Sequence, residues 1–367
     1  MADNEQKKMK IVFFGNATEK NAAIRYRVQK FADMFEVEGY PCIVCLPSSV
    51  DFYLKYFENQ PKYKKAIYWL CVWLRRWFQL RHIFNADVIF LRGPIFKYGP
   101  PIFEYIIHLF NKNMVFDIDD AVWEKPAFVK NYSLRFIDFD WAKKMCKICA
   151  GAVVGNRYLE EHVKQWGAKK IAIVPTCIDI EKHQQKKEYP KHNNPVIIGW
   201  TGTHTNLGYL DILKEPLKEL SKKYPIQLFI ASNGLNYNME GVNVVFENWK
   251  LEKEFEYLQR PDIGLMPLID TPRARGKCAF KALEYMGVGT PVVISPVGMN
   301  AEVIENGVHG FLAQTPEEWY DRLERLITNP DLREQMGRKA RQRIVDLYSF
   351  EANYPQLKEF LLDIAKG

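Results

Sequence analysis

The chain has 367 residues, of which 47% are hydrophobic and 26% are charged, a composition typical of a globular protein with enough apolar material for two cores. Its formal net charge of +7 is too small to indicate nucleic acid as a partner by itself. The polar N-terminus, MADNEQKKMK, lacks the apolar segment of a secretory signal, and the longest apolar run, Ala66–Leu74, is too short to span a bilayer. We therefore expect a soluble, cytoplasmic protein.

The chain contains seven cysteines, an odd number that is typical of reduced thiols rather than of a disulfide framework. Two CxxC pairs, Cys42/Cys45 and Cys146/Cys149, suggest a zinc site. However, Cys42 and Cys45 lie in a predicted strand, where residues three apart face opposite sides. The two pairs are also too far apart in sequence for a compact zinc module. The pattern favours core thiols over zinc ligands.

Short runs rich in β-branched residues alternate with longer helical stretches along nearly the whole chain. Apolar strands separated by helices indicate an α/β fold with parallel sheets that are covered on both faces. In the first half we predict strands at Lys10–Phe14, Pro41–Leu46, Val88–Leu91, Met114–Asp117, Gly151–Val154 and Ile171–Val174. In the second half we predict strands at Val196–Trp200, Ile226–Ile230, Val242–Phe246, Ile263–Met266, Pro291–Ile294 and Gly310–Leu312.

A polar, charged segment, Glu181–Asn194, joins the two halves and is typical of an interdomain linker. We predict an N-terminal domain at 1–182, a linker at 183–194, a second domain at 195–345 and a C-terminal helix at 346–367 that could pack back on the first domain. Because ligands bind beyond the carboxyl ends of parallel strands, we expect two doubly wound, Rossmann-like domains facing a central cleft.

Arg25 and Arg27 follow the first predicted strand. They either attract an anionic substrate or form the solvated face of a helix, and the sequence leaves both interpretations open.

The tract at residues 61–82 combines basic and aromatic residues without any acid. Trp69, Trp73 and Trp77 recur every four residues and would form one stripe on a helix. A basic helix with a tryptophan stripe is typical of a segment that lies in the interface of an anionic bilayer, which is the interpretation we favour. Alternatively, the tryptophans face the core and the charges face water. Nucleic acid would suit the same charges, but no recognised binding module accompanies them. The basic residues are Lys62, Lys64, Lys65, Arg75, Arg76 and Arg81.

Three carboxylates, in Asp117-Ile-Asp-Asp120, lie at the tip of a strand that is predicted to be buried. They repel one another unless they are paired, protonated or bound to a cation. We expect Asp119 or Asp120 to bind a substrate hydroxyl or to assist as a base, with Asp117 beside that substrate. The alternative is a helix N-cap with a salt bridge. A DxD pattern could also bind a metal together with a diphosphate.

A glycine-containing turn, Ile198–Asn206, follows the first strand of the second domain. Gly202 would let the backbone approach a ligand closely, and Thr203 would add a hydroxyl group. This pattern is weak alone, because many turns between a strand and a helix are similar.

Three cations, Arg275, Lys277 and Lys281, lie where a helix is predicted to begin near Cys278 or Ala279. Lys277 and Lys281 would then share one helix face and repel each other. The helix N-terminus already carries a partial positive charge, so cations are unfavourable there.

A bound diphosphate would remove this repulsion and accept hydrogen bonds from the backbone N–H groups at the helix start. The alternative is a solvated basic loop in which Lys281 pairs with Glu284, and this would leave Arg275 and Lys277 without a partner. We favour the anion site. The donors expected at the helix start are the N–H groups of Cys278, Ala279 and Phe280.

These segments resemble the donor-binding domain of retaining GT-B glycosyltransferases, the group 1 or family four enzymes of surface-polysaccharide and glycolipid assembly. The resemblance covers essentially the whole chain, with motifs in both halves. The strings that carry it are GKCAFKALEYM at 276–286, GTPVV at 289–293, SPVGMN at 295–300, IGW at 198–200, DIGLMPL at 262–268 and FDIDD at 116–120.

The resemblance implies that Glu284 binds the ribose hydroxyls of the donor. A second family glutamate, which contacts the donor sugar, falls on Gly276 here, so this chain departs from the family at the sugar contact. The family's Arg and Lys after the first strand of this domain are also absent. Their absence makes Lys277 and Lys281 the candidates for binding the diphosphate.

By the same analogy, Gly15 faces the donor phosphate, and Gly298 and Asn300 lie beside the sugar or the phosphates. The predicted reaction moves a hexosyl or N-acetylhexosaminyl group from a UDP- or GDP-sugar to a glycan or lipid-linked acceptor, with retention. Lys281 would stabilise charge on the leaving phosphate. Such enzymes generally do without a metal, so we expect neither a metal nor a cofactor.

The predicted location is cytoplasmic and peripheral on the inner face of the cell membrane. Two other functions remain open at this point. One is a GT-B sugar-nucleotide epimerase, which needs no acceptor. The other is a non-catalytic scaffold or binding subunit with the same fold.

Overall fold

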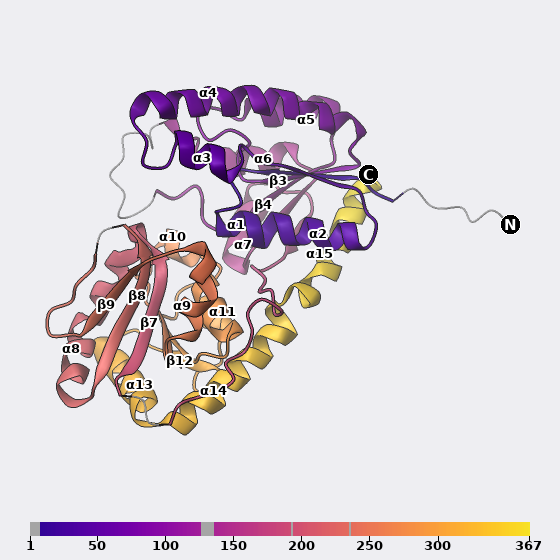
Figure 1. The fold of residues 1–367 in the computed structure, drawn as a ribbon. Helices are drawn as coiled ribbons and strands as arrows, with labels where there is room; N and C mark the ends of the chain where they lie inside the picture. Colours follow the sequence, from indigo (N-terminus) through magenta and orange to yellow (C-terminus); the bar gives the residue numbers. More distant parts are fainter. Residues whose placement is uncertain (1–7, 126–135, 192–193, 235) are drawn as a thin grey trace. The chain divides into compact units, whose positions relative to one another are not determined.

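The computed structural model describes residues 8–125, 136–191, 194–234 and 236–367. The chain divides into two compact units (Figure 1). Within the described ranges, the first unit comprises residues 8–125, 136–177 and 353–367, and the second unit comprises 178–191, 194–234 and 236–352.

The first unit contains a parallel six-stranded sheet in the order β2-β1-β3-β4-β5-β6. All six strands predicted for this half are confirmed to within one residue at each end. Strands β1, β3, β4 and β5 are buried along their whole length, as expected for a sheet covered on both faces. The strands are β1 (Ile11–Gly15), β2 (Cys42–Cys45), β3 (Val88–Arg92), β4 (Met114–Ile118), β5 (Gly151–Val154) and β6 (Ile171–Ile173).

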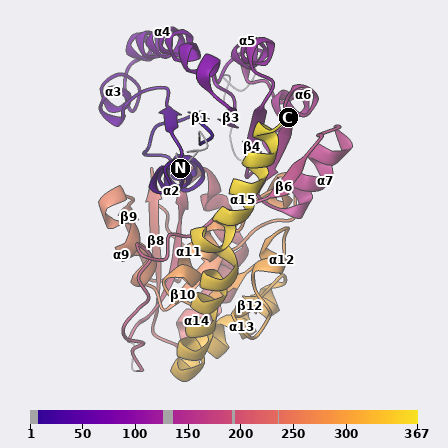
Figure 2. The ribbon, with the colours of Figure 1, turned by 90° about the vertical axis from the view of Figure 1, so that its right-hand side faces the viewer.

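Helices cover both faces of this sheet, with α4 and α5 on one face and α2 on the other (Figure 2). Asn21 and Asn156 cap the starts of α1 and α7 by accepting backbone N–H groups, which is why these helices begin where they do. The helical segments are α1 (Ala22–Ile24), the π-helix η1 (Arg25–Gln29), α2 (Lys30–Val37), α3 (Val50–Tyr56), α4 (Lys62–Gln79), η2 (Leu80–Asn85), α5 (Ile102–Phe110), α6 (Trp141–Ile148) and α7 (Arg157–Gln165).

The second unit contains another parallel six-stranded sheet, in the order β12-β11-β10-β7-β8-β9. The predicted strands are again confirmed, although β7 and β8 each extend three residues further than predicted and β9 begins and ends two residues later. The strands are β7 (Val196–Thr203), β8 (Ile226–Asn233), β9 (Val244–Asn248), β10 (Ile263–Met266), β11 (Val292–Ile294) and β12 (Gly310–Leu312).

The core of this unit includes two fully buried tryptophans, Trp200 of β7 and Trp319 of α13. Thr315 and Glu318 form a reciprocal capping box at the start of α13, and Pro316 occupies the first turn. The helical segments are η4 (His204–Leu213), α8 (Lys214–Lys223), η5 (Leu251–Lys253), α9 (Glu254–Gln259), α10 (Pro272–Arg275), α11 (Phe280–Gly287), α12 (Asn300–Val303), α13 (Pro316–Thr328), α14 (Pro330–Arg343) and η6 (Ile344–Tyr348).

Each strand order reverses once, between β1 and β3 in the first sheet and between β7 and β10 in the second. Connections leave such a switch point in opposite directions, so space for a ligand opens at the carboxyl edge of the strands. The doubly wound topology predicted from the sequence is therefore confirmed for both sheets.

The polar segment predicted as a linker packs against the second unit over its described residues. The Tyr189 hydroxyl donates to the carbonyl of Gly289 at 2.9 Å. Arg341 of α14 donates to the carbonyl of His183 at 2.6 Å and to that of Ile180, just before the segment, at 2.8 Å. The segment is thus held mainly through backbone carbonyls, so its polar composition does not make it a solvated spacer.

His183 lies fully buried within this segment, with its ring edge-on to Phe255 at 4.9 Å. Its Nδ1 lies 3.0 Å from the carbonyl oxygen of Asp179. Burial lowers the pKa of His183 to about 4. The hydrogen bond with the Asp179 carbonyl and the negative charge of the Asp179 side chain oppose this effect. The neutral imidazole is therefore the form that this packing accommodates.

Because the folded-state pKa of His183 is below its unfolded value of about 6.5, the stability that depends on the neutral ring is complete above that value and is lost as the pH falls toward 4. We expect the free energy of unfolding of the second unit to fall by about 2 kcal/mol between pH 7 and pH 5 through this residue. Urea denaturation at both pH values measures the change. His183→Gln should reduce the pH dependence, and an unchanged slope in that variant would contradict the assignment.

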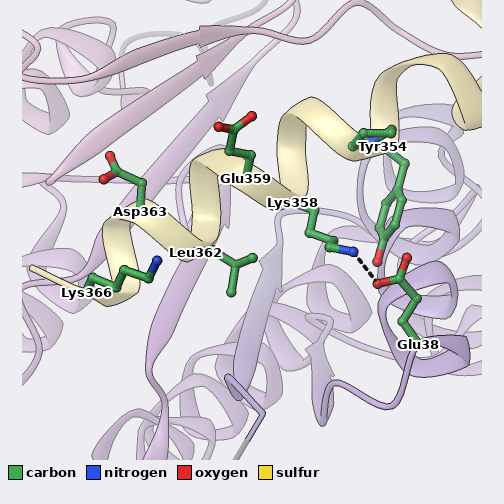
Figure 3. Close-up of a pocket in the computed structure, with 8 residues that line it drawn as sticks. Glu38, Tyr354, Lys358, Glu359, Leu362, Asp363 and Lys366 are labelled. Atoms are coloured by element: carbon green, nitrogen blue, oxygen red, sulfur yellow. Dashed lines mark hydrogen bonds and ion pairs between the residues drawn. The ribbon is translucent and has the colours of Figure 1, made fainter. Parts of the chain in front are cut away.

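The C-terminal helix α15 (Phe350–Ala365) contacts the first unit through its residues from 353 onward. Tyr354 packs on Phe35 with ring centroids 5.0 Å apart, and Lys358 bonds Glu38 at 2.7 Å. A pocket of about 410 Å³ lies along this helix (Figure 3). None of the site residues predicted from the sequence lines it. The lining residues are Glu38, Tyr354, Pro355, Lys358, Glu359, Leu362, Asp363 and Lys366.

Candidate functional site

The predicted donor-binding residues of the second unit lie in three loops at the carboxyl edge of its sheet. Gly202 and Thr203 end β7, and the segment 267–279 follows β10. The segment 295–299 follows β11. Because β10 pairs with both β7 and β11, these three loops start from neighbouring strands at the switch point.

The helix that carries Lys281 begins at Phe280, slightly later than predicted. Ala279 precedes it in a left-handed conformation with φ 52° and ψ 20°, which is rare for a residue other than glycine. Lys277 consequently lies in the loop before the helix, and the prediction that Lys277 and Lys281 share one helix face is wrong.

Lys281 reaches the end of β7. Its Nζ lies 5.2 Å from the ring centroid of Trp200, within the range of a cation–π contact. A side chain at Gly202 would place Cβ 2.6 Å from Cε of Lys281. Gly202 therefore makes room for the lysine, rather than serving only for the ligand approach that the sequence suggested.

Arg275 forms a two-point ion pair with Asp270, with Nε–Oδ1 at 2.6 Å and Nη2–Oδ2 at 2.8 Å. The hydrogen bond from Arg275 also lowers the pKa of Asp270. The expectation that Arg275 lacks a partner in an unliganded loop is therefore wrong. Both side chains are about half exposed, so the pair remains accessible to a ligand.

Gly298 lies directly against the backbone of Arg275 at the end of α10. Its φ is +54°, and an added Cβ would lie 2.3 Å from the carbonyl oxygen of Arg275. Ser295 accepts the N–H of Leu268 at 2.9 Å, and Asn300 donates from Nδ2 to the carbonyl of Ser295 at 3.0 Å. The structure thus brings the loops after β10 and β11 together.

The remaining predicted donor residues differ in accessibility. Glu284, Cys278 and Ala279 are buried, whereas Lys277 and Phe280 are partly exposed. Thr203 is exposed, and its Oγ1 lies 2.9 Å from Oγ1 of Thr205 and accepts from Asn206 at 3.0 Å.

In the first unit, two arginines pair with Asp117 and Asp119 of the acidic cluster. Asp117 is fully buried and accepts from Arg27 at 2.5–3.1 Å, while Nε of Arg92 lies 3.1 Å from its Oδ2. Arg92 also bonds Asp119. Burial alone would raise the pKa of Asp119, but the charges of Arg92 and Arg27 outweigh this effect and lower that pKa. The sequence left open whether these carboxylates are paired, protonated or bound to a cation, and the structure shows Asp117 and Asp119 paired with arginines.

Arg27 is therefore neither an exposed acceptor contact nor a solvated helix face, because only 1% of its surface is exposed. Asp117 is likewise inaccessible to an acceptor. Asp119 and Asp120 are partly exposed beside this ion pair and stay available as candidate contacts. Arg25 bonds the carbonyl of Lys20 at 2.9 Å and is also partly exposed.

Arg92 was missed in the sequence because it ends an apolar strand. A signal for it existed, since it directly opposes Asp117 in the register of β3 with β4. Among the residues that the structure describes, no group of three or more His, Cys, Asp or Glu side chains could hold a metal ion.

Gly15 ends β1, and an added Cβ would lie 2.6 Å from Leu46, so its surroundings are apolar. Its carbonyl accepts from Arg76 of α4, which also donates to the carbonyls of Cys45 at 3.0 Å and Ile95 at 2.9 Å. Arg76 is fully buried, so its assignment to a membrane-facing surface is wrong. The guanidinium instead joins α4 to the edge of the sheet.

The comparisons with known proteins agree with this architecture. Residues 195–329 match the family of group 1 glycosyl transferases. Curated proteins similar to the chain include the D-inositol 3-phosphate glycosyltransferases of Corynebacterium urealyticum (26% identity, covering 52% of this chain and 50% of that protein) and Corynebacterium jeikeium (24% identity, 60% and 62%). The aligned region thus spans between half and two thirds of the length of these relatives.

Similar solved structures align over nearly the whole chain. Sucrose-phosphate synthase from Thermosynechococcus elongatus has a TM-score of 0.69 at 13% identity and covers 97% of this chain and 99% of that one. A glycosyltransferase from Rickettsia africae ESF-5 has a TM-score of 0.69 at 14% identity, and the alignment covers 98% of this chain and 99% of that chain. HepE from Anabaena, in complex with UDP-glucose, has a TM-score of 0.68 at 14% identity, and the alignment covers 97% of this chain and 100% of that chain.

The molecule therefore has the GT-B fold of glycosyltransferases, as the resemblance predicted. The match to the group 1 glycosyl transferases, at residues 195–329, falls within the range of the second unit.

Proposed function

We propose that this chain is a glycosyltransferase that takes a sugar from a nucleotide-diphosphate-sugar donor. The observation that carries the proposal is the position of Lys281, which lies on Trp200 at the switch point of the group 1 domain. A lysine at the N-terminal end of α11 places a positive charge where the leaving diphosphate of a donor would gain negative charge. The fold supplies the conventional place for such a ligand.

In this proposal the donor contacts are those predicted from the sequence. Lys281 and Lys277 bind the diphosphate, Arg275 contacts it from its pair with Asp270, and Glu284 binds the ribose. Gly298 and Asn300 form the facing loop. A UDP- or GDP-sugar is the proposed donor, since HepE is solved with UDP-glucose at 14% identity. No metal or cofactor is required by these contacts.

The acceptor is proposed to bind at Asp119 and Asp120 of the first unit. The low pKa of Asp119 keeps it ionised, so it suits accepting a hydrogen bond from a sugar hydroxyl more than it suits strong base catalysis. Retention, a hexosyl or N-acetylhexosaminyl donor, and a glycan or lipid-linked acceptor in surface-glycan assembly are the finer elements of the proposal. TarM, a structural neighbour at 16% identity, is solved with UDP and α-GlcNAc-glycerol.

The reaction type is tested by incubating the protein with UDP- and GDP-sugars without acceptor. Slow release of UDP or GDP together with free sugar supports a transferase. Formation of a new nucleotide sugar without release of UDP or GDP would instead indicate an epimerase. Binding without any conversion, also in the presence of acceptors, would indicate the scaffold.

We also propose that the first unit binds an anionic membrane surface, as a peripheral protein on the cytoplasmic face. Exposed apolar side chains of α4 continue onto η2 and α5, and Trp77 packs on Phe103 with ring centroids 5.3 Å apart. We name these residues the aromatic surface. They are Tyr63, Ile67, Leu70, Trp73, Leu74, Trp77, Phe78, Phe84, Ile102, Tyr105, Leu109 and Phe110.

The charges around the aromatic surface favour lipid. Lys62, Arg75 and Arg81 are exposed, and Glu104 of α5 is buried, where it accepts from Trp141 at 2.9 Å. Aromatic and basic side chains together are typical of segments that lie in an anionic interface. Trp69 contributes little, since it packs on Phe57, Phe96 and Tyr98. Within the described ranges, no helix has the length and hydrophobicity needed to cross a bilayer.

We expect the double variant Leu109→Ser/Phe110→Ser to weaken binding to vesicles containing anionic lipid by about tenfold or more, because two largely exposed apolar side chains are removed. Trp73→Ser/Phe78→Ser should act similarly. Vesicle flotation measures the effect. The control is Val37→Ser/Leu347→Ser, which removes exposed apolar side chains outside the aromatic surface. Equal flotation of all variants would refute membrane binding through this surface.

A further inference from the structure

The side chain of Lys281 follows an unusual path at the end of β7. Tyr285, one turn later on α11, packs on the face of the sheet to which Gly199 and Gly264 belong, since added Cβ atoms there would lie 3.3 Å from its hydroxyl and 2.5 Å from its Cγ. Strand residues alternate between faces, so Trp200 and Gly202 point to the opposite face. Lys281 therefore passes over the end of β7 to reach the ring of Trp200.

Two features hold the lysine in this path. An added Cβ at Gly202 would lie 2.6 Å from Cε of Lys281 and 2.8 Å from Cη2 of Trp200, so the missing side chain leaves the passage open. Trp200 itself is 1% exposed and is packed in the core with Leu210 and Leu228, which fixes its ring. A rigid ring thus supports the otherwise flexible lysine side chain.

We propose that Trp200 is a positioning residue that holds the ammonium group of Lys281 toward the donor diphosphate. This inference rests on the proposed function. An indole ring attracts a cation without cancelling its charge. The ring therefore orders the lysine before the ligand binds, and this lowers the entropy cost of binding.

The test measures dissociation constants of UDP and uridine, and of GDP and guanosine, by calorimetry. The diphosphate contribution is the ratio of nucleotide affinity to nucleoside affinity in whichever pair binds the wild type. We expect Trp200→Leu to lower this ratio about tenfold while leaving nucleoside affinity unchanged. Trp200→Phe retains an aromatic face and should lose about threefold or less. Gly202→Ala, which obstructs the passage, should also lower the ratio.

Coupling to the lysine separates positioning from general stability. In a Lys281→Ala background, Trp200→Leu should cause no further loss of the ratio. Trp319→Leu, which removes another buried tryptophan of the same core, should lower the melting temperature without changing the ratio. Equal weakening of nucleoside and nucleotide binding by Trp200→Leu and Gly202→Ala would overturn this inference but not the proposed function. Fully additive losses of Trp200→Leu and Lys281→Ala would do the same. If none of the four compounds binds the wild type, the proposed function itself is overturned, and the inference falls with it.

Discussion

Replacing Lys281 by alanine is expected to lower kcat/KM for nucleotide-sugar turnover by about 10²- to 10³-fold. Losses of this size follow removal of one preorganised group that stabilises charge in a transition state. The side chain is held in advance by Trp200 and by the space at Gly202, so it needs little reorganisation during the reaction. Because its charge matters most as the phosphate leaves, the decrease should appear largely in kcat.

The measurement is the rate at which the nucleoside diphosphate is released from the donor that the wild type accepts. Lys222→Ala is the matched control, because this exposed lysine of α8 pairs only with Glu219 of its own helix at 2.5 Å among the contacts described. The control should retain wild-type kinetics. A Lys281→Ala enzyme within about threefold of the wild type would remove Lys281 from the mechanism.

Asp117→Asn is expected to lower the free energy of unfolding of the first unit by about 3–5 kcal/mol. The substitution removes the charge that neutralises Arg27, which is 1% exposed, and weakens the contact with Arg92. Breaking a buried ion pair leaves an uncompensated charge in the interior, which accounts for the size of the loss. The same change made in an exposed pair should cost far less, since water screens the charges.

Urea denaturation followed by a spectroscopic signal of the first unit measures this loss. The control is Asp270→Asn, which breaks the half-exposed pair with Arg275 and should cost about 1 kcal/mol or less. Similar losses in the two variants would contradict the structural role assigned to the buried pair.

The two units should also respond to acid in different ranges. The pKa of Asp119 is lowered, so the stability from its carboxylate is complete above its unfolded value of about 3.8 and is lost only as the pH falls through the lower folded value. The effect of His183 begins earlier, below about 6.5. Mild acid should therefore weaken the second unit before the first.

The parallel sheets could be predicted because their strands are short, apolar and rich in β-branched residues, features that a local pattern records. The pairing of Arg27 with Asp117 could not, since 90 residues separate them and only the sheet brings them together. The assignment of Arg76 to a membrane-facing surface was wrong for a related reason. A basic residue on an amphipathic helix is usually solvated, and its burial depends on carbonyl oxygens supplied by other segments.

The candidate donor site shows the same division. The sequence located its cations and glycines because turns after strands carry such residues in this fold. It did not reveal that Gly202 accommodates Lys281 or that Asp270 pairs with Arg275, since both contacts depend on the path of a loop. The sequence placed Trp200 in a strand and in the IGW string that carries the resemblance, but it gave no role to the ring, which lies beside the cation at the centre of the proposal.

The most direct test of the proposed donor site is a thermal-shift series with UDP-, GDP- and other nucleotide sugars on the wild-type protein. A ligand at about a hundred times its dissociation constant adds about 2.7 kcal/mol of stability, which is readily seen as a higher melting temperature. We predict a shift with one nucleotide class, which would also identify the base of the donor. Unchanged melting with every nucleotide sugar would contradict a donor site at Lys281.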